Sequence, residues 1–373
     1  MSGAVVSRDG VEGVGADFLE LPAMVYARDP NWIPEEADAV ARAFSAANPW
    51  FVGRSARTFV VPGLARAAAF YDPALEIKGE RVAFFGYWES AGDADADLAV
   101  MDDVRAWARA RGAQRLYGPI QFTTAHTYRF LVSAEPNALP MPGEPYNPLH
   151  YAKQIEALGF AVERRFLTLI VSATDAARTY EKRASLHAKL ASVGYRFERL
   201  DSKVWMESLD DLYEVVESSF HDNFAYAPMT IAQFRAVAGE SIAKKLSPEL
   251  SFVVYAPGGA IAGFAVANPH YGPLIVASAG AARVKTSDLS YEVHAPLLAK
   301  MGPIDYVLKT ICLVPEHQKV GLGAVVVALF GKKHVEAGGG RVFGALTRED
   351  GVPRHLTEGA DAERWYALYT SAL

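Results

Sequence analysis

A glycine-containing turn at residues 313–324 carries residue types that suit binding of a phosphate anion. It joins an apolar, β-branched run, Tyr306–Val314, to a helical pattern, Gly321–Ala337. The first N–H groups of a helix lack an internal partner and lie at the positive end of the helix dipole. Glycine leaves room for a pyrophosphate to approach that backbone. The turn therefore predicts an anion site at a strand–helix junction.

Two common nucleotide motifs do not fit this turn. A Rossmann fingerprint needs a third glycine three residues after Gly323, where this chain has Val326. A P-loop ends in Gly-Lys-Ser/Thr, which is absent here. An ordinary strand–turn–helix junction that binds no ligand stays open as an alternative.

The pattern Gln-x-x-Gly-x-Gly, from Gln318 to Gly323, follows a strand ending in Val-Pro and resembles the acyl-CoA motif of the GNAT superfamily of N-acyltransferases. The resemblance implies acetyl-CoA or another acyl-CoA as co-substrate, with its pantetheine and thioester beside the backbone of Leu313 and Val314. It also implies that the pyrophosphate is held by Gln318, Lys319, Val320, Gly321, Leu322, Gly323 and Ala324.

Short motifs in order along nearly the whole chain are similar to bacterial proteins with two tandem GNAT-like halves. They run from Phe18-Leu-Glu-Leu-Pro22 and Asp29-Pro-Asn-Trp32 through Gly118-Pro119 to the closing Trp365-Tyr-Ala-Leu-Tyr369. The resemblance implies an α/β fold of two tandem GNAT-like domains, with a mixed sheet and helices on both faces. We expect a flexible tail at residues 1–16, a first domain at 17–173 and an acyl-CoA-binding domain at 174–373.

Apolar residues at helical and at strand spacing alternate along the chain, which favours an α/β sheet. The predicted helices are Asp17–Ala27, Pro34–Ala47, Ala96–Arg111, Tyr151–Leu158, Ala176–Ser192, Leu209–Phe220, Ile231–Leu246 and Gly321–Ala337. The predicted strands are Arg57–Val61, Ala65–Tyr71, Arg81–Trp88, Leu116–Ile120, Phe166–Val171, Arg196–Leu200, Phe252–Tyr255, Ile261–Ala267, Tyr306–Val314, Arg341–Leu346 and Arg364–Leu373.

The first half departs from the acyl-CoA pattern at the corresponding place. The strand ending at Trp88 is followed by Glu89-Ser-Ala-Gly-Asp-Ala-Asp-Ala-Asp97 and has no glycine loop. These acidic residues suit a helix N-terminus and would repel a pyrophosphate. We therefore expect a degenerate first domain that binds no coenzyme A.

Direct acyl transfer from a thioester to an amine needs a donor for the oxyanion and a base for the ammonium proton. The resemblance implies that the donor is a backbone N–H near Leu313 or Val314. His221 follows the predicted helix Leu209–Phe220, in a loop that borders the acceptor in the superfamily. It is the candidate base, although histidine also suits a helix C-terminus for purely structural reasons.

The departing thiolate needs an acid, which in the superfamily is usually a tyrosine after the fifth strand. Residues 347–357 contain no tyrosine. His355 is one candidate for this role, and Tyr366 or Tyr369 of the last strand are others. Surface exposure for the histidine and core packing for the tyrosines are the competing explanations.

The composition fits an enzyme that acts on small molecules. Of 373 residues, 51% are hydrophobic and 21% charged, and the formal net charge is −6. The sequence contains no basic run, so we expect no nucleic-acid partner. The longest apolar run is too short to span a membrane, so we expect no membrane partner. The pattern around the lone Cys312 predicts a core residue, and no spacing of Cys, His or Asp suggests a metal site. We expect a cytoplasmic location.

The sequence thus predicts an acyl-CoA-dependent N-acyltransferase that modifies a small-molecule amine. Two alternatives remain open at this stage. One is an aminoacyl-tRNA-dependent transferase, a class that also pairs two GNAT-like halves. The other is a catalytically silent protein that binds coenzyme A, because fold alone does not establish activity.

Overall fold

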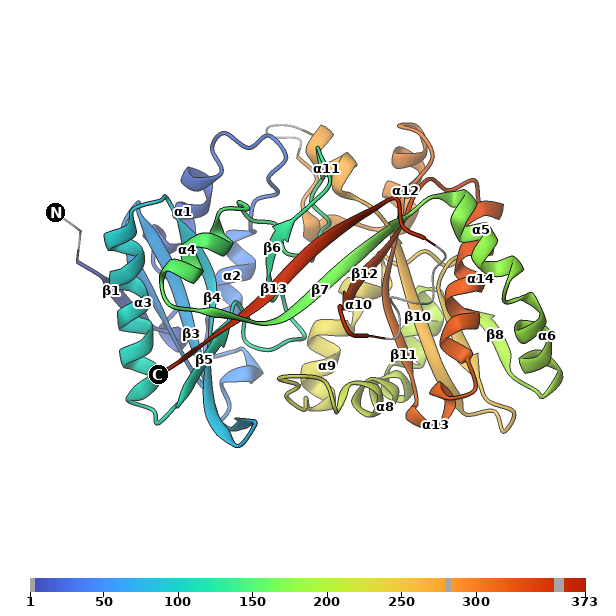
Figure 1. Ribbon diagram of the computed structural model, residues 1–373, viewed down its shortest axis with the longest axis horizontal. Helices are drawn as coiled ribbons and strands as arrows, with labels where there is room; N and C mark the ends of the chain where they lie inside the picture. The colour runs from blue at the N-terminus through green and yellow to red at the C-terminus, as the bar shows by residue number, and fades with distance from the viewer. Residues whose placement is uncertain (1–3, 279–282, 352–358) are drawn as a thin grey trace. The chain divides into compact units, whose positions relative to one another are not determined.

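The computed structural model describes residues 4–278, 283–351 and 359–373, and its chain divides into two units (Figure 1). Unit 1 comprises Met1–Ser133, Leu139–Arg165 and Tyr366–Leu373. Unit 2 comprises Ala134–Ala138 and Phe166–Trp365. This division differs from the linear one expected from the sequence, because each unit draws strands from distant parts of the chain.

The sheet of unit 1 has a mainly antiparallel order. Its neighbouring strands are β1 (Val6–Asp9), β2 (Ser55–Val61), β3 (Ala65–Ile77), β4 (Glu80–Ser90), β5 (Arg115–Gly118) and the C-terminal part of β13 (Ala362–Ala372). Only β4 and β5 run parallel among these pairs, and β13 joins β5 through Tyr369–Ala372. Strand β1 lies in the stretch expected to be a flexible tail, and its pairing with β2 corrects that expectation for residues 6–9.

Helix α3 covers one face of this sheet. The helices of unit 1 are α1 (Ala16–Val25), α2 (Ala37–Ala43), α3 (Ala94–Arg109) and α4 (Tyr151–Ala157). Along α3, Ala96, Val100 and Val104 recur at four-residue spacing and are fully buried in the core beneath it. A short strand, β6 (Phe130–Ser133), completes the unit.

The sheet of unit 2 repeats this plan. Its neighbouring strands are β7 (Ala161–Val171), β12 (Val342–Arg348), β11 (Tyr306–Leu313), β10 (Ile261–Pro269), β9 (Phe252–Tyr255) and β8 (Arg196–Arg199). The part of β7 from Phe166 to Val171 pairs with β12. Again one pair of neighbours, β11 and β12, is parallel, and the helix that connects them is α14 (Leu322–Glu336).

Two helical layers enclose the sheet of unit 2. The remaining helices are α5 (Ala173–Glu181), α6 (Ala184–Ser192), α7 (Ser202–Glu207), α8 (Leu209–Phe220), α9 (Ile231–Ala238), α10 (Glu240–Ala243), α11 (Gly272–Ala277), α12 (Tyr291–Ala299) and α13 (Pro315–Gln318). Ile311 and Leu313 pack into the core that contains α14, whereas Cys312 and Val314 pack into the core that contains α8. Alternate side chains of β11 therefore join both layers.

The predicted α/β class, with a mixed sheet and helices on both faces, is confirmed, with local differences. The predicted helix Ile231–Leu246 is interrupted at Gly239, whose ψ of −135° is not helical. The predicted helix Ala176–Ser192 consists of α5 and α6, which separate at Lys182 and Arg183. Among the described residues, none of the helices has the length and apolar character needed to cross a membrane.

Candidate functional site

The parallel strands β11 and β12 pair only over their first residues. Tyr306 to Leu308 lie opposite Val342 to Gly344, and there the recorded ladder ends. Strand β11 continues to Leu313, while the later part of β12 pairs with β7 as far as Arg348. The second half of β11 thus continues past its ladder with β12 and leads into the predicted anion turn.

The register with β10 decides which backbone groups of β11 point to this edge. Val314 N–H donates to the Ala262 carbonyl at 3.0 Å. Hydrogen-bonded and non-hydrogen-bonded pairs alternate along an antiparallel ladder. The N–H groups of Leu313 and Ile311 therefore point away from β10. The Val314 N–H already has an acceptor, so Leu313 is the better placed of the two predicted donors. Ile311, which the sequence pattern did not indicate, joins Leu313 as a candidate.

The turn from β11 to α14 contains a glycine in a left-handed conformation. After the single turn α13, Gly321 adopts a left-handed conformation with φ of 82° and forms the N-cap of α14. The first recorded helical bond runs from Val325 N–H to the Gly321 carbonyl at 3.3 Å. By helix geometry the N–H groups of Leu322, Gly323 and Ala324 have no acceptor within α14. These groups form the candidate anion site.

Two side chains hold the backbone immediately before this turn. Ser219 Oγ and Gln318 Nε2 each donate to the Leu313 carbonyl at 3.0 Å. The side chain of Gln318 therefore braces the turn, and Lys319 and Val320 are exposed within it. Sequence patterns could not reveal the contact with Ser219, because it joins residues 94 positions apart.

A buried tyrosine anchors α13 to the rest of unit 2. The Tyr195 hydroxyl and His317 Nδ1 lie 2.8 Å apart, and His317 Nε2 lies 3.2 Å from the Glu316 carboxylate. The His317 side chain is only 17% exposed. This chain of contacts fixes the first turn of the loop, and the sequence analysis did not assign His317 a role.

The predicted base, His221, lies at the C-terminal cap of α8, two residues after Ser219. Its side chain is 75% exposed, with Nδ1 3.1 Å from the Asp222 carboxylate. On the same helix, Glu217 accepts a short hydrogen bond from the Tyr226 hydroxyl. Burial and the Glu217 carboxylate both raise the pKa of Tyr226, so its phenol remains protonated. Glu217 is a second candidate base that the sequence analysis missed.

The residues predicted as candidate acids differ in location and in burial. His355 lies outside the described residues. Tyr366 and Tyr369 belong to unit 1, and both side chains are buried, at 0% and 1% exposure. Burial raises the pKa of Tyr369 to about 12. Catalysis by Tyr366 or His355 stays a prediction.

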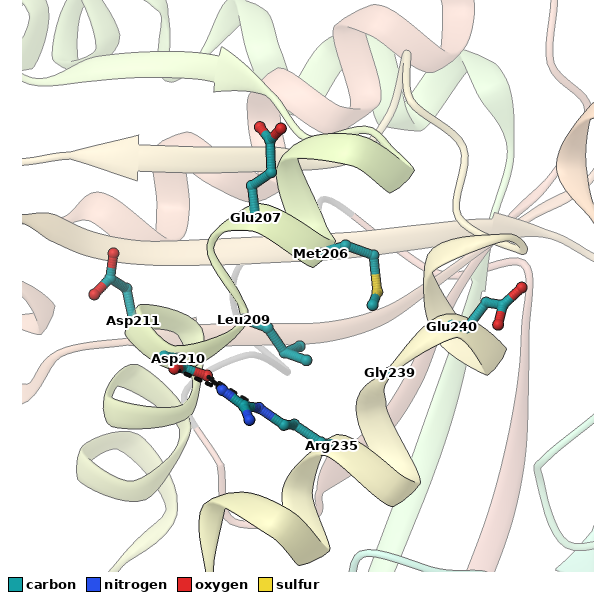
Figure 2. Close-up of a pocket in the computed structure, with 8 residues that line it drawn as sticks. All are labelled: Met206, Glu207, Leu209, Asp210, Asp211, Arg235, Gly239 and Glu240. Carbon is teal, nitrogen blue, oxygen red and sulfur yellow. Dashed lines mark hydrogen bonds and ion pairs between the residues drawn. The ribbon is translucent and has the colours of Figure 1, made fainter.

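A hollow of about 480 Å³ lies at the other end of α8 (Figure 2). Its lining residues are Met206, Glu207, Leu209, Asp210, Asp211, Arg235, Gly239 and Glu240. Arg235 and Asp210 form an exposed ion pair at 2.6 Å, a type that contributes little to stability. Along α8, Asp210 is nine residues from Ser219, a rise of roughly 13 Å at ~1.5 Å per residue. The hollow therefore lies far from the end of β11.

In unit 1 the edge equivalent to that of β11 is closed. Strands β4 and β5 pair in parallel over Val82–Phe84, and Ile120 N–H then donates to the Phe85 carbonyl at 2.7 Å. The next residue of β4 is Gly86, where an added Cβ would come within 2.6 Å of the Ile120 carbonyl oxygen. The backbone of Ile120 thus covers the edge of β4. At the equivalent point in unit 2, β11 extends past its ladder with β12.

The N-terminus of α3 is also capped, by side chains of the residues around it. Asp93 Oδ1 accepts the Ala96 N–H at 2.9 Å as an N-cap. Ser90 Oγ donates to Asp97 Oδ2 at 2.9 Å and accepts Gly92 N–H at 3.0 Å. Carboxylates thus occupy the place where a pyrophosphate would bind. These contacts support the expectation that the first half binds no coenzyme A.

Other chemistries find little support in unit 2. Cys312 is fully buried and burial raises the pKa of its thiol, so it is not a ready nucleophile. Across the described parts of the chain, no group of three His, Cys, Asp or Glu residues could hold a metal ion.

The chain has distant relatives among characterised proteins, and no family model matches it. It is 23% identical to Protein YghO of Escherichia coli over 247 residues, which cover 62% of this chain and 60% of that protein. It is 23% identical to the bacterial ceramide synthase of Caulobacter vibrioides over 231 residues, 59% of each chain. The match thus spans about three fifths of the length of these relatives.

Solved structures resemble nearly the whole chain. The glucosamine N-acetyltransferase region, related to GCN5, of a fungal multi-domain β-N-acetylglucosaminidase has a TM-score of 0.54 at 12% identity, covering 100% of this chain and 38% of that one. A tandem GNAT protein from the clavulanic acid biosynthesis pathway has a TM-score of 0.50 at 13% identity, covering 99% and 98%. The fold of this chain is thus that of tandem GNAT-like proteins.

Proposed function

We propose that this protein is an acyl-CoA-dependent N-acyltransferase that modifies an amine, with acetyl as the simplest acyl group. The observation that carries the proposal is the end of the β11–β12 ladder at Leu308, well before β11 itself ends, followed by the left-handed Gly321 and the N-terminus of α14. The N–H groups of Ile311 and Leu313 suit the carbonyl groups of pantetheine and thioester, and the helix N-terminus suits a pyrophosphate.

The proposed reaction is a direct transfer. The amine nitrogen forms a bond to the thioester carbon, the C–S bond breaks with its electron pair on sulfur, and the ammonium loses a proton. The N–H of Ile311 or Leu313 would stabilise the oxyanion. His221 or Glu217 would accept the proton, since both lie on the same end of α8 as Ser219, which contacts Leu313.

The proposed acceptor is a small-molecule amine. The end of α8 carries Glu217 and Asp222, carboxylates that favour an approaching ammonium ion. The N–H groups at the end of β11 and the helix N-terminus argue for a transferase that uses coenzyme A over one that uses aminoacyl-tRNA. We accordingly propose no nucleic-acid partner and, for a small-molecule acceptor, no membrane partner.

A more specific candidate is N-acylation of a lipid-like amine with a long acyl chain. It is favoured by the resemblance to the Caulobacter ceramide synthase. A ceramide is an amide of a long-chain amino alcohol, so its formation is the same bond-forming step with a larger acyl group and acceptor.

The proposal is tested by measuring thiol release from acetyl-, octanoyl- and palmitoyl-CoA with spermidine, lysine or sphinganine as acceptor. We expect amine-dependent release of coenzyme A, with an equal amount of amide detected by mass spectrometry. Preference for palmitoyl-CoA with sphinganine would support the lipid candidate. Firm acyl-CoA binding with thiol release at background for every pair would contradict transferase activity and support a silent binding protein.

A further inference from the structure

The peptide unit between Leu313 and Val314 is held at both ends. Its carbonyl accepts hydrogen bonds from Ser219 and Gln318, and its N–H donates to Ala262, all at 3.0 Å. These three partners come from α8, the anion turn and β10. The last peptide of β11 is therefore fixed in orientation where the strand leaves its ladder with β12.

The contact made by Ser219 differs from the usual behaviour of a helical serine. A serine hydroxyl near a helix end commonly bonds a carbonyl of its own helix. The neighbouring Ser218 does this, donating to the Val215 carbonyl at 3.1 Å. Ser219 instead donates to Leu313, on a different element. Its hydroxyl links α8, where His221 and Glu217 lie, to the backbone edge that would receive the thioester.

We propose that Ser219 is a positioning residue, which orients the end of β11 for acyl transfer by holding the Leu313 carbonyl. This inference rests on the proposed function. A fixed peptide after Leu313 restricts the backbone rotation of Leu313, and with it the direction of the Leu313 N–H. An oxyanion donor helps only if it already points to where the charge develops.

The position of Ser219 predicts an effect on turnover and not on coenzyme A affinity. The backbone N–H groups proposed to bind the pyrophosphate belong to residues 321–324. Among the described residues, Ser219 donates its hydrogen bond to Leu313 and not to these groups. Losing its hydroxyl would leave those N–H groups in place. The acyl-transfer step would slow, because it depends on a backbone donor that has become less ordered.

The test compares Ser219→Ala with Ser218→Ala, which removes the adjacent hydroxyl that stays within its own helix. Ser219→Thr restores a hydroxyl at the same position. For each full-length variant, kcat and KM are measured with the most active acyl-CoA and amine pair, and the Kd of coenzyme A is measured by calorimetry. Amide hydrogen exchange of peptides covering residues 309–314 is followed by mass spectrometry.

We expect Ser219→Ala to lower kcat roughly tenfold, equivalent to about 1.4 kcal/mol, with the Kd changed less than twofold. Exchange at residues 309–314 should rise, while Ser218→Ala should match the wild type and Ser219→Thr should recover. Unchanged kcat, or a parallel loss of affinity, would overturn the proposal. If the wild type binds coenzyme A but turns over no pair, the proposed function fails by itself. Amide hydrogen exchange at residues 309–314 then tests the positioning role of Ser219 by itself. Equal exchange in Ser219→Ala and the wild type would overturn that role.

Discussion

Gly321 meets two demands that other residue types satisfy poorly. Its φ of 82° lies in the left-handed region, which side chains with a Cβ rarely adopt. An added Cβ would also come within 3.0 Å of Leu186 Cδ2 on α6. A larger residue would strain the turn and displace the backbone N–H groups that follow it.

We predict that Gly321→Val weakens acetyl-CoA binding at least tenfold, because the first N–H groups of α14 can no longer converge on a pyrophosphate. Gly338 offers a matched control just after the same helix, with φ of 68° and open space around its Cβ position. Gly338→Val carries similar backbone strain and should leave the Kd unchanged. Calorimetry that gave the same Kd for Gly321→Val and the wild type would refute the assignment of the turn.

At the residue scale, the sequence predicts which residue types form the turn better than it predicts where their backbone groups point. The sequence predicted a glycine-containing turn between a strand and a helix, but it did not predict that Gly321 would be left-handed. The direction of each N–H on β11 was not predictable either, because it depends on register with β10. Ser219 acts through a contact that exists only in the fold.

At the scale of elements, a buried charge cluster joins five segments of unit 1. Arg66 of β3 is fully buried and donates to the Glu35 carboxylate and the Phe18 carbonyl, both at 2.6 Å. Its guanidinium lies 4.0 Å from Glu89 of β4, which also accepts a 2.8 Å hydrogen bond from Tyr151 of α4. Because the cluster sits at the end of β4, it ties α1, α4 and both strands together beside the closed edge.

Burial raises the pKa of Glu89 to about 7, although Arg66 and the hydrogen bond from Tyr151 oppose the shift. The folded-state pKa therefore lies above the unfolded value of about 4.3. Below that value both states are protonated. As pH rises from about 4.3 to 7, only the unfolded state loses its proton, so the free energy of unfolding falls, by at most about 4 kcal/mol.

We predict that Glu89→Gln removes most of this loss, because glutamine does not titrate. Urea unfolding at pH 5, 6, 7 and 8 would measure it as a flatter dependence of stability on pH. Glu20→Gln, at an exposed carboxylate of α1, should keep the wild-type dependence. Parallel curves for Glu89→Gln and the wild type would show that Glu89 does not titrate in this range.

Strongly periodic elements were predicted best. The helix Leu209–Phe220 has the predicted bounds, because a clear apolar face marks it. Helix α14 has no such face, since it is buried along a continuous apolar run, but the glycines around that run placed both its ends within one residue. The breaks at Gly239 and at Lys182 were missed, since apolar spacing continues across them. Strand β1 is short, and its pairing with β2 is not encoded in its own pattern.

At the scale of the whole molecule, the two halves share an order of elements but not a binding surface. Both contain a parallel strand pair joined by a helix. In unit 1 the strand edge is covered by Ile120, and Asp93 caps the helix. In unit 2 the ladder ends early and Gly321 is the N-cap of the helix. The acidic stretch predicted the carboxylate cap in unit 1, but no sequence pattern indicated that the strand edge there would be covered.

The exchange of strands between the halves was not predictable from local patterns. Residues 166–171 of β7 pair with β12 in unit 2, and Tyr369–Ala372 of β13 pair with β5 in unit 1. Strand periodicity identifies a strand and its buried faces, but it does not choose the neighbour. A linear division into 17–173 and 174–373 could not represent this pairing.

The central claim is that one acyl-CoA binds to unit 2, at β11 and the start of α14. Amide hydrogen exchange with and without saturating acetyl-CoA tests it most directly, because one experiment reports on both halves. We predict slower exchange in peptides covering residues 309–325 and no change in those covering 85–97. Protection at residues 85–97, or none at 309–325 under conditions where binding is measured, would contradict this account.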